Sequence, residues 1–274
     1  LEKELIKLIP KIGSGQLKDF ISIAVCDTRF TPTMNLNELL SYAKDDLSLI
    51  KELQLMMERV MNELLIEAKG ELKDSFFLHI MPNLGVKNGK ELMKYAKHAD
   101  IGTTDIQFII NGAIKQAGLL VLLNQYISSK TGIAPFGSDF NVRNAPKTTN
   151  ELIDLCKANI PNNLMPLLIG VGDTVTSNKE TITDHWLRGG SDREFLTLIQ
   201  ELGKAYKKEN QVMFINSGNK EVYRPYINEH QMQGVSDPED KLKFNAIFEK
   251  GPNQYIDWFG KLTSRYAKDK FTQK

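Results

Sequence analysis

The stretch Leu167-Leu168-Ile169-Gly170-Val171-Gly172-Asp173-Thr174 is the part of this sequence that decides its expected fold. A hydrophobic strand, predicted over residues 165–171, runs into two glycines and then an aspartate. Glycine lets a backbone turn tightly beside a phosphate or a metal, and functional groups in an open α/β sheet gather just beyond the carboxyl ends of the strands. Asp173 is therefore expected where a hard cation such as magnesium could bind a carboxylate oxygen. The alternative is a simple turn in which Asp173 caps a local group.

Regular elements alternate on both sides of this strand. Before it, a helix is predicted over residues 150–159, stopped by Pro161. After it, a helix over 192–207 with Ser191 as its cap precedes a strand over 212–216. Strands that alternate with helices of this length are typical of βαβ units, so the second half of the chain is expected to form a parallel sheet.

The first third of the chain has a different pattern. Apolar residues recur at helical spacing over residues 37–69, with Asn35 or Asn37 as a cap and Gly70 as a stop. The residues on this apolar face are Leu49, Leu53, Met56, Val60 and Leu64. A long helix among separated strands favours an α+β unit.

Shorter elements follow the long helix. Residues 75–80, ended by a proline, and residues 105–110 are predicted strands. Between them, Asn88 followed by Glu91 resembles a capping box, which predicts a helix over 88–96.

Lys115 lies near the beginning of a strongly apolar helix predicted over residues 113–129, with Gly132 just beyond its end. A loop rich in Gly, Pro, Asn and Ser is expected over 132–149. A positive charge in the first turn opposes the helix dipole, so the position is unfavourable for stability. Lys115 could bind a phosphate there together with backbone N–H groups. The alternative is an ordinary solvated lysine.

Asp192 is a second candidate acid, within Arg188-Gly189-Gly190-Ser191-Asp192-Arg193-Glu194-Phe195. It falls at the start of a predicted helix, where the dipole favours a carboxylate without any function. A structural and a functional role both remain open at this point.

Composition limits the class of protein. With 274 residues, the chain is long enough for one large domain or two ordinary ones. The net charge of +1, from 35 basic and 34 acidic residues without a basic stripe, gives no support to nucleic-acid binding. No apolar run is long enough to span a bilayer, and the mixed-charge start is not a secretory signal. Cys26 and Cys156 lack metal-type spacing, which predicts two reduced thiols in a cytoplasmic protein.

Other chemistries lack their motifs. There is no G-x-S-x-G, no Walker loop, no metal-type histidine spacing and no third glycine for a dinucleotide fingerprint. Asp27 follows a strand-like run, as a nucleophilic aspartate would, but Arg29 stands where a general-acid aspartate would be needed. Asp27 is therefore interpreted as structural.

Several segments, taken in order, resemble one family over nearly the whole chain: the cyanobacterial-type glucosylglycerol 3-phosphatases of the haloacid dehalogenase-like superfamily. The matching segments are Ser75-Phe76-Phe77-Leu78-His79, Pro82-Asn83-Leu84-Gly85, Gly102-Thr103-Thr104-Asp105-Ile106-Gln107-Phe108, Lys115-Gln116-Ala117-Gly118, Leu164-Met165-Pro166-Leu167, 170–177 and 188–195. The resemblance implies the C-terminal half of a Rossmannoid core over residues 111–274 and an α+β cap, which selects the substrate, over residues 1–110.

The resemblance also implies a mechanism. One aspartate attacks phosphorus, and a second, two residues later, protonates the departing sugar oxygen. Magnesium and a lysine neutralise the phosphoryl oxygens. By position, Lys115 matches that lysine and Asp173 the first magnesium-binding acid. The second acid is expected a few residues after Asp173, and Asp192 matches it across an insertion over residues 178–190.

The family's Asp-x-Asp nucleophile motif is expected before Leu1, so this chain is expected to be truncated at its N-terminus and inactive alone. For substrate binding, Asn83, Thr104, Asp105 and Gln107 could hydrogen-bond sugar hydroxyls. The alternative is that they serve turns and sheet pairing.

The resulting prediction is a cytoplasmic, magnesium-dependent phosphatase that converts glucosylglycerol 3-phosphate to the compatible solute glucosylglycerol, a function in salt tolerance. Its partner is a small sugar phosphate, without nucleic acid or membrane. Three alternatives remain: a sucrose- or trehalose-phosphate phosphatase, a non-catalytic sugar-phosphate-binding fragment, and a nucleotide-binding domain.

Overall fold

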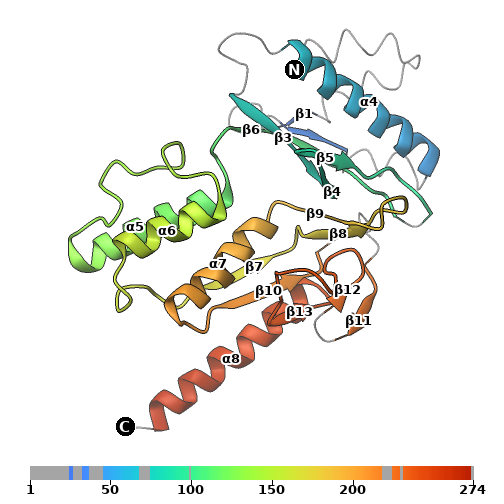
Figure 1. The fold of residues 1–274 in the computed structure, drawn as a ribbon. Coiled ribbons are helices and arrows are strands. Elements are labelled where there is room, and N and C mark those ends of the chain that lie inside the picture. Colours follow the sequence, from blue (N-terminus) through green and yellow to red (C-terminus); the bar gives the residue numbers. More distant parts are fainter. Residues whose placement is uncertain are drawn as a thin grey trace.

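The structure is a computed structural model that describes residues 25–26, 33–36, 46–67, 75–98, 100–217, 224–228 and 231–272. It is a mixed α/β protein (Figure 1). In the first part of the chain the elements are β1 (Val25–Cys26), β2 (Thr33–Asn35), α4 (Leu47–Glu67), β3 (Phe76–Met81), β4 (Asn83–Lys87), β5 (Lys90–Met93) and β6 (Asp105–Ile110). They continue with α5 (Lys115–Thr131), α6 (Thr149–Asn159), β7 (Ile169–Gly172), β8 (Thr176–Lys179), β9 (Trp186–Gly189), α7 (Arg193–Tyr206), β10 (Gln211–Ile215), β11 (Tyr226–Asn228), β12 (Gln231–Met232), β13 (Ala246–Phe248) and α8 (Pro252–Thr272).

The first part of the chain forms an antiparallel sheet in the order β1-β2-β6-β3. Helix α4 lies along this sheet (Figure 1). The predicted apolar face of α4 packs on this sheet: Leu53, Met56 and Val60 are buried together with Ile80 and Ile106 of the strands. The α+β character expected for this region is therefore present in the described residues.

The start of α4 differs from the prediction. The helix begins at Leu47, where the Asp46 carboxylate accepts hydrogen bonds from the Ser48 and Leu49 amides at 3.0 and 3.1 Å. Asn35, predicted as a cap, lies instead in β2. Asn37 and Gly70 lie outside the described residues.

The helix predicted over 88–96 is wrong, because this segment is a β-hairpin of β4 and β5. Asn88 and Gly89 form the turn with φ of 52° and 74°, and an Asn-Gly pair with two positive φ angles is the preferred two-residue hairpin turn. Glu91 does not cap a helix. It pairs instead with His79 at 2.8 Å and accepts from the Ile80 amide at 2.5 Å.

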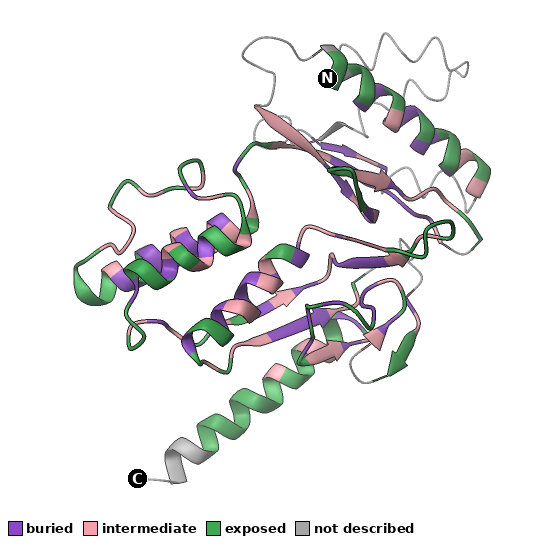
Figure 2. Ribbon diagram, in the orientation of Figure 1, coloured by how far each residue is buried: buried purple, intermediate pink, exposed green. Residues whose placement is uncertain are grey.

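The second part of the chain contains the predicted parallel sheet, in the order β13-β10-β7. Helix α7 packs on it through Leu196 and Ile199, and an added Cβ at Gly170 would lie 2.6 Å from Ile199 Cδ1. The strand β7 is shorter than predicted, since the Leu164 and Met165 amides bond back to the Pro161 carbonyl in a turn. Figure 2 shows the buried residues gathered in β10 and α7.

Two more helices complete this part. Helix α5 begins and ends two residues later than predicted, at Lys115 and Thr131, and Gly132 follows its end at φ 76°, as predicted. Helix α6 begins with a capping box of Thr148 and Glu151. Both helices share a core with α7. Helix α8 contacts β13 through its first turns and then extends away from the body (Figure 1), and it is mostly exposed (Figure 2).

The insertion expected over 178–190 is a second hairpin, β8–β9, which sequence reasoning did not anticipate. It lies between the two parts of the molecule (Figure 1) and contacts β4, with the Asn178 amide donating to the Leu84 carbonyl at 3.0 Å.

Within the described residues, no helix is both long enough and apolar enough to cross a membrane.

Gly89 and Gly118 provide a matched test of the hairpin assignment. An added Cβ meets nothing within 4 Å at either position, but Gly89 has φ 74° whereas Gly118 is in the interior of α5. We expect Gly89→Ala to lower the free energy of unfolding by about 1 kcal/mol, and Gly118→Ala to raise it by about 0.5–1 kcal/mol. Urea denaturation measures both. Stabilisation by Gly89→Ala would contradict the hairpin.

Candidate active site

The three residues predicted to act on phosphate and metal come together at one place. Lys115 is the first residue of α5, Asp173 directly follows β7, and Asp192 is the N-cap of α7. The Lys115 ammonium contacts the Asp192 carboxylate and donates to the Ser191 hydroxyl at 3.0 Å. Asp192 Oδ2 accepts from the backbone amides of Asp173 and Thr174, both at 2.9 Å. Segments far apart in the sequence thus share one set of contacts.

Small residues make this approach possible. An added Cβ at Gly172 would lie 2.8 Å from Asp192 Cβ, a distance that real side chains do not adopt. Gly190 has φ 97°, and a Cβ there would lie 2.2 Å from the Thr174 carbonyl oxygen. The Asp192 amide in turn donates to that carbonyl at 3.1 Å. The antiparallel hairpin β8–β9 therefore brings the chain back to the turn at Asp173 and Thr174, which directly precedes the hairpin.

Asp173 is held by hydroxyl groups. Its Oδ1 accepts from Thr174 Oγ1 at 2.8 Å and its Oδ2 from Ser217 Oγ at 2.5 Å. Burial by itself would raise the pKa of Asp173, but hydrogen bonds from the Ser217 and Thr174 hydroxyls, with the charge of Lys115, lower the pKa below its ordinary value. A carboxylate that stays ionised at neutral pH suits a cation-binding role.

Two helix N-termini converge on these residues. The N-cap of α5, Ile114, makes no side-chain capping bond, and Asp192 does not cap its own helix, α7. Ser191, predicted as that cap, is instead a partner of Lys115. The uncapped amides, the positive ends of two helix dipoles and the Lys115 ammonium together favour an anion.

The two carboxylates fit a magnesium ion by chemistry. Mg²⁺ is usually bound through one or two protein carboxylates, with water and substrate phosphate filling the other positions. Asp173 and Asp192 supply two such groups, although in this structure their oxygens are occupied by the hydrogen bonds above. In the parts of the chain that the structure describes, no cluster of three or more His, Cys, Asp or Glu residues could hold a metal.

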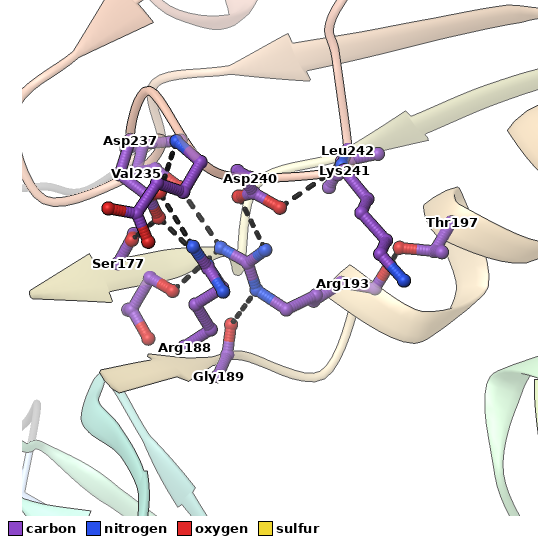
Figure 3. A network of polar contacts seen from close by, with 12 residues as sticks. Ser177, Arg188, Gly189, Arg193, Thr197, Val235, Asp237, Asp240, Lys241 and Leu242 are labelled. Carbon is purple, nitrogen blue, oxygen red and sulfur yellow. Dashed lines mark hydrogen bonds and ion pairs between the residues drawn. The ribbon is translucent and has the colours of Figure 1, made fainter. Parts of the chain in front are cut away.

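A buried arginine that the sequence analysis did not single out, Arg193, connects the start of α7 with the hairpin β8–β9 (Figure 3). Arg193 follows Asp192 in the chain and is 6% exposed. Its guanidinium donates to Asp240 Oδ2 at 2.6 Å and to the carbonyls of Thr176 and Gly189 at 2.8 and 3.2 Å. It thereby joins the start of α7 to both strands of the hairpin.

A second arginine closes the same network (Figure 3). Arg188 donates two hydrogen bonds to the buried Asp237, at 2.9 and 2.7 Å, and Ser177 also donates to that carboxylate. Burial would raise the pKa of Asp237, but the bonds from Arg188 and Ser177 lower it below its ordinary value. The only sequence indication was the acidic run Asp237-Pro238-Glu239-Asp240, which has no fixed spacing to its partners.

The predicted substrate-binding residues are not part of this cluster in their observed contacts. Asn83 is fully buried, donates to the Ile80 carbonyl at 2.9 Å and accepts from the Gly85 amide and the Thr176 hydroxyl at 2.9 and 3.1 Å. These contacts favour the alternative, in which Asn83 has a structural role: it stabilises the local backbone between Ile80 and Gly85 and connects β4 with β8 through Thr176.

The other three lie in or beside β6. The Thr104 amide donates to the Met81 carbonyl at 3.0 Å. Gln107 donates to the Asp105 carboxylate at 3.1 Å, and these two residues pair with His79 and Met81 of β3. Sheet pairing accounts for these contacts, and a role in substrate binding stays a prediction.

Two further predictions concern Asp27 and the cysteines. Asp27 lies outside the described residues. Cys156 is a free, buried thiol in the core of α5, α6 and α7, where burial raises its pKa to about 12. It is therefore a packing residue and not a reactive thiol.

Comparison with known proteins gives the family. The family model of glucosylglycerol-phosphate phosphatase matches residues 1–263. The chain belongs to the glucosylglycerol-phosphate phosphatase family. A glucosylglycerol-phosphate phosphatase of Synechocystis sp. (strain ATCC 27184 / PCC 6803 / Kazusa) is 41% identical over an alignment of 267 residues, and the alignment covers 93% of this chain and 63% of that relative. The chain thus spans less than two thirds of the relative's length. No solved structure matches it.

Membership of the glucosylglycerol-phosphate phosphatase family confirms the resemblance inferred from the ordered segments. Asp173 and Asp192 do not form a short local motif because the hairpin β8–β9 separates them in the chain.

Asp237 permits a test of the ion-pair network formed by Arg188, Arg193 and their acidic partners. Because its pKa is lower in the folded protein than in the unfolded chain, its stabilisation is complete above about pH 4 and is lost as pH falls through the folded pKa. We expect Asp237→Asn to lower the free energy of unfolding by about 2–3 kcal/mol at pH 7, since Arg188 is only partly buried, and by less below pH 4.

Urea denaturation of both proteins across pH 3–8 measures this difference (roughly the range over which a lowered Asp pKa acts). Asp184→Asn is the control, because Asp184 is 83% exposed, and it should change stability at pH 7 by less than about 0.5 kcal/mol. A difference between Asp237→Asn and the unsubstituted protein that does not shrink at low pH would contradict the assignment.

Proposed function

We propose that this chain supplies the phosphate- and magnesium-binding part of an enzyme that hydrolyses glucosylglycerol 3-phosphate to glucosylglycerol and phosphate. The observation that supports this most directly is the meeting of Lys115, Asp173 and Asp192 from three separate segments. Family membership and the relative's printed name, glucosylglycerol-phosphate phosphatase, supply the substrate.

Lys115 is proposed to bind the phosphoryl group. Its ammonium lies at the N-terminus of α5, beside the N-terminus of α7, and is held there by Asp192 and Ser191. Charge that builds on the phosphoryl oxygens during P–O cleavage would be stabilised by this cation and by the helix amides, which are already oriented. Asp192 therefore acts on Lys115 by fixing its position.

Asp173 and Asp192 are proposed to hold the magnesium ion. Asp173 is the more accessible of the two, since hydroxyl groups, which can rotate, occupy its oxygens. When bound, the ion would neutralise phosphoryl oxygens and orient the ester. The lowered pKa of Asp173 keeps its carboxylate charged for this role at neutral pH.

The proposed reaction passes through a phosphorylated aspartate. A carboxylate attacks phosphorus, the bond to the sugar oxygen breaks, and a second carboxylic acid gives that oxygen its proton. The sequence has no two aspartates spaced two residues apart, and Asp173 and Asp192 are engaged as described. The proposal therefore places the nucleophile outside the described residues.

The fold fits a haloacid dehalogenase-like core with a cap. Under this proposal, residues 111–274 belong to the core, which includes the parallel sheet and α5 to α7, and residues 1–110 form the cap, which includes α4 and the antiparallel sheet. The hairpin β8–β9, which contacts β4, would join the two.

Phosphate release from glucosylglycerol 3-phosphate, with magnesium, tests the proposed function in this chain and in an N-terminally extended form. In whichever form is active, Lys115→Ala and Asp173→Asn should each lower kcat by about 100-fold or more. Asp154→Asn, on the exposed side of α6, should leave it unchanged. Faster release from sucrose or trehalose phosphate would contradict the substrate assignment. If this chain alone is active, Asp27→Asn is the next variant.

Gly172 tests whether the spacing of the two acids matters. Since an added Cβ would lie 2.8 Å from Asp192 Cβ, Gly172→Ala should displace Asp192 and lower kcat by about 10- to 100-fold, with a higher magnesium requirement. Gly118→Ala, which meets nothing within 4 Å, is the matched control. A fully active and folded Gly172→Ala protein would show that the contact of Asp192 with the Asp173 turn is not needed.

A further inference from the structure

A cavity of about 790 Å³ lies where the first part of the chain meets the hairpin β8–β9 and the segment that follows β11. Its size is that of a typical small-molecule site. Polar and charged side chains dominate its lining, and none of the three candidate active-site residues is among them. The lining residues are Lys94, Lys97, His98, Asp100, Ser177, Asn178, Lys179, Trp186, Ile227, Gln231, Gln233, Gly234 and Ser236.

The charge of this lining is positive. Three lysines face one aspartate. Lys94 pairs with Asp100 at 2.5 Å, and Lys179 pairs with the exposed Asp184 at 2.7 Å. Lys97 forms no ion pair within the described residues. An anion that entered would therefore find at least one cation without a competing carboxylate.

The loop that presents Lys94 and Lys97 is held in place by its backbone. The Lys97 and Asp100 main chains exchange two hydrogen bonds of 2.9 and 3.1 Å, and the Thr103 amide donates to the Lys94 carbonyl at 2.7 Å. Gly102 has φ 76°, and a Cβ there would lie 2.2 Å from the Lys94 carbonyl oxygen. His98 adopts φ 55°, a conformation uncommon for a residue with a side chain. The main chain that carries these two lysines is thus held in place by the contacts within the protein.

The uncharged part of the lining suits a hydroxylated ligand. Trp186 offers an aromatic surface, and Asn178, Gln231 and Gln233 offer amides. Ser236 is 9% exposed, and its hydroxyl has no hydrogen-bond partner in the described structure. A buried hydroxyl without a partner is costly, so a ligand or water is expected to bond to it.

We propose that this cavity binds a sugar phosphate, with the phosphate beside Lys97 and the sugar between Trp186 and the Ser236 hydroxyl. Asn178 follows Asp173 by five residues, so the cavity begins at most about 18 Å from the candidate active site along an extended chain. Binding here does not require turnover. The ligand is separate from a molecule held at the active site, because a phosphate bound by Lys115 cannot at the same time lie beside Lys97.

Tryptophan fluorescence tests this proposal. The chain has two tryptophans, so Trp258→Phe leaves Trp186 as the only reporter. We expect glucose 6-phosphate, titrated without magnesium, to change the emission of Trp186 in a saturable way. Lys97→Gln should raise the Kd by about fivefold or more, whereas Lys157→Gln, an exposed lysine on α6, should leave it unchanged. The effect of Lys97→Gln on the Kd should be smaller at high salt, because salt screens the attraction between the lysine and the phosphate.

Each outcome of these titrations either supports or overturns the proposal. An unsaturable response, or equal affinities in the Lys97→Gln and Lys157→Gln proteins, would overturn it. Inorganic phosphate binding as tightly as glucose 6-phosphate would show an anion site without a sugar part and would overturn the assignment to a sugar phosphate. A response that survives Lys115→Ala would support a separate site in the cavity, whereas its loss would mean that the ligand is held from the active site and would overturn the proposal. None of these results depends on phosphatase activity, so a failure of the proposed function would be seen separately.

Discussion

The carboxylate of Asp192 is the group on which the organisation of the second half of the molecule depends. It accepts two backbone hydrogen bonds from the turn after β7 and contacts the lysine that begins α5, while its own main chain begins α7. A carboxylate only 5% exposed needs such partners, because an unpaired buried charge is strongly unfavourable. The same contacts that satisfy this charge place Lys115 and Asp173 beside each other. Stability and the arrangement of the candidate active site therefore have one cause.

A second set of ion pairs begins at the residue that follows Asp192. Arg193 and Arg188 pair with Asp240 and Asp237, and these acids come from the segment before β13 (Figure 3). The hairpin β8–β9 lies between these ion pairs and the turn after Asp173. What the sequence presents as an insertion is thus a structural connection. It sets the position of the second acid relative to the first and also reaches the first part of the chain through Asn83 and Asn178.

The same hairpin borders two different environments. At its beginning and end lie the carboxylates and the lysine of the candidate active site, and at its tip lie Lys179, Trp186 and the cavity shared with residues 94–100. An anionic sugar suits both places by elementary chemistry: cations and helix amides for the phosphate, an aromatic ring and amides for the hydroxyl groups. A single two-stranded element therefore connects the part of the molecule suited to phosphate with the part suited to a larger polar ligand.

The sequence by itself determined the elements that depend on local patterns. The strands around residues 76–81 and 105–110, the helices α5 and α6 and the parallel βαβ arrangement follow from hydrophobic spacing and capping residues. Family-like segments also identified Lys115, Asp173 and Asp192, whose meeting the structure shows. The Asn88-Gly89 turn was equally local, but a capping-box pattern four residues long, from Asn88 to Glu91, competed with it, and only pairing with a partner strand decides between the two. The partners of Arg188 and Arg193, the role of the β8–β9 hairpin and the cavity beside Lys97 were decided by the tertiary structure alone. Each of them joins residues that are far apart in the chain, and helix or strand periodicity carries no information about such contacts.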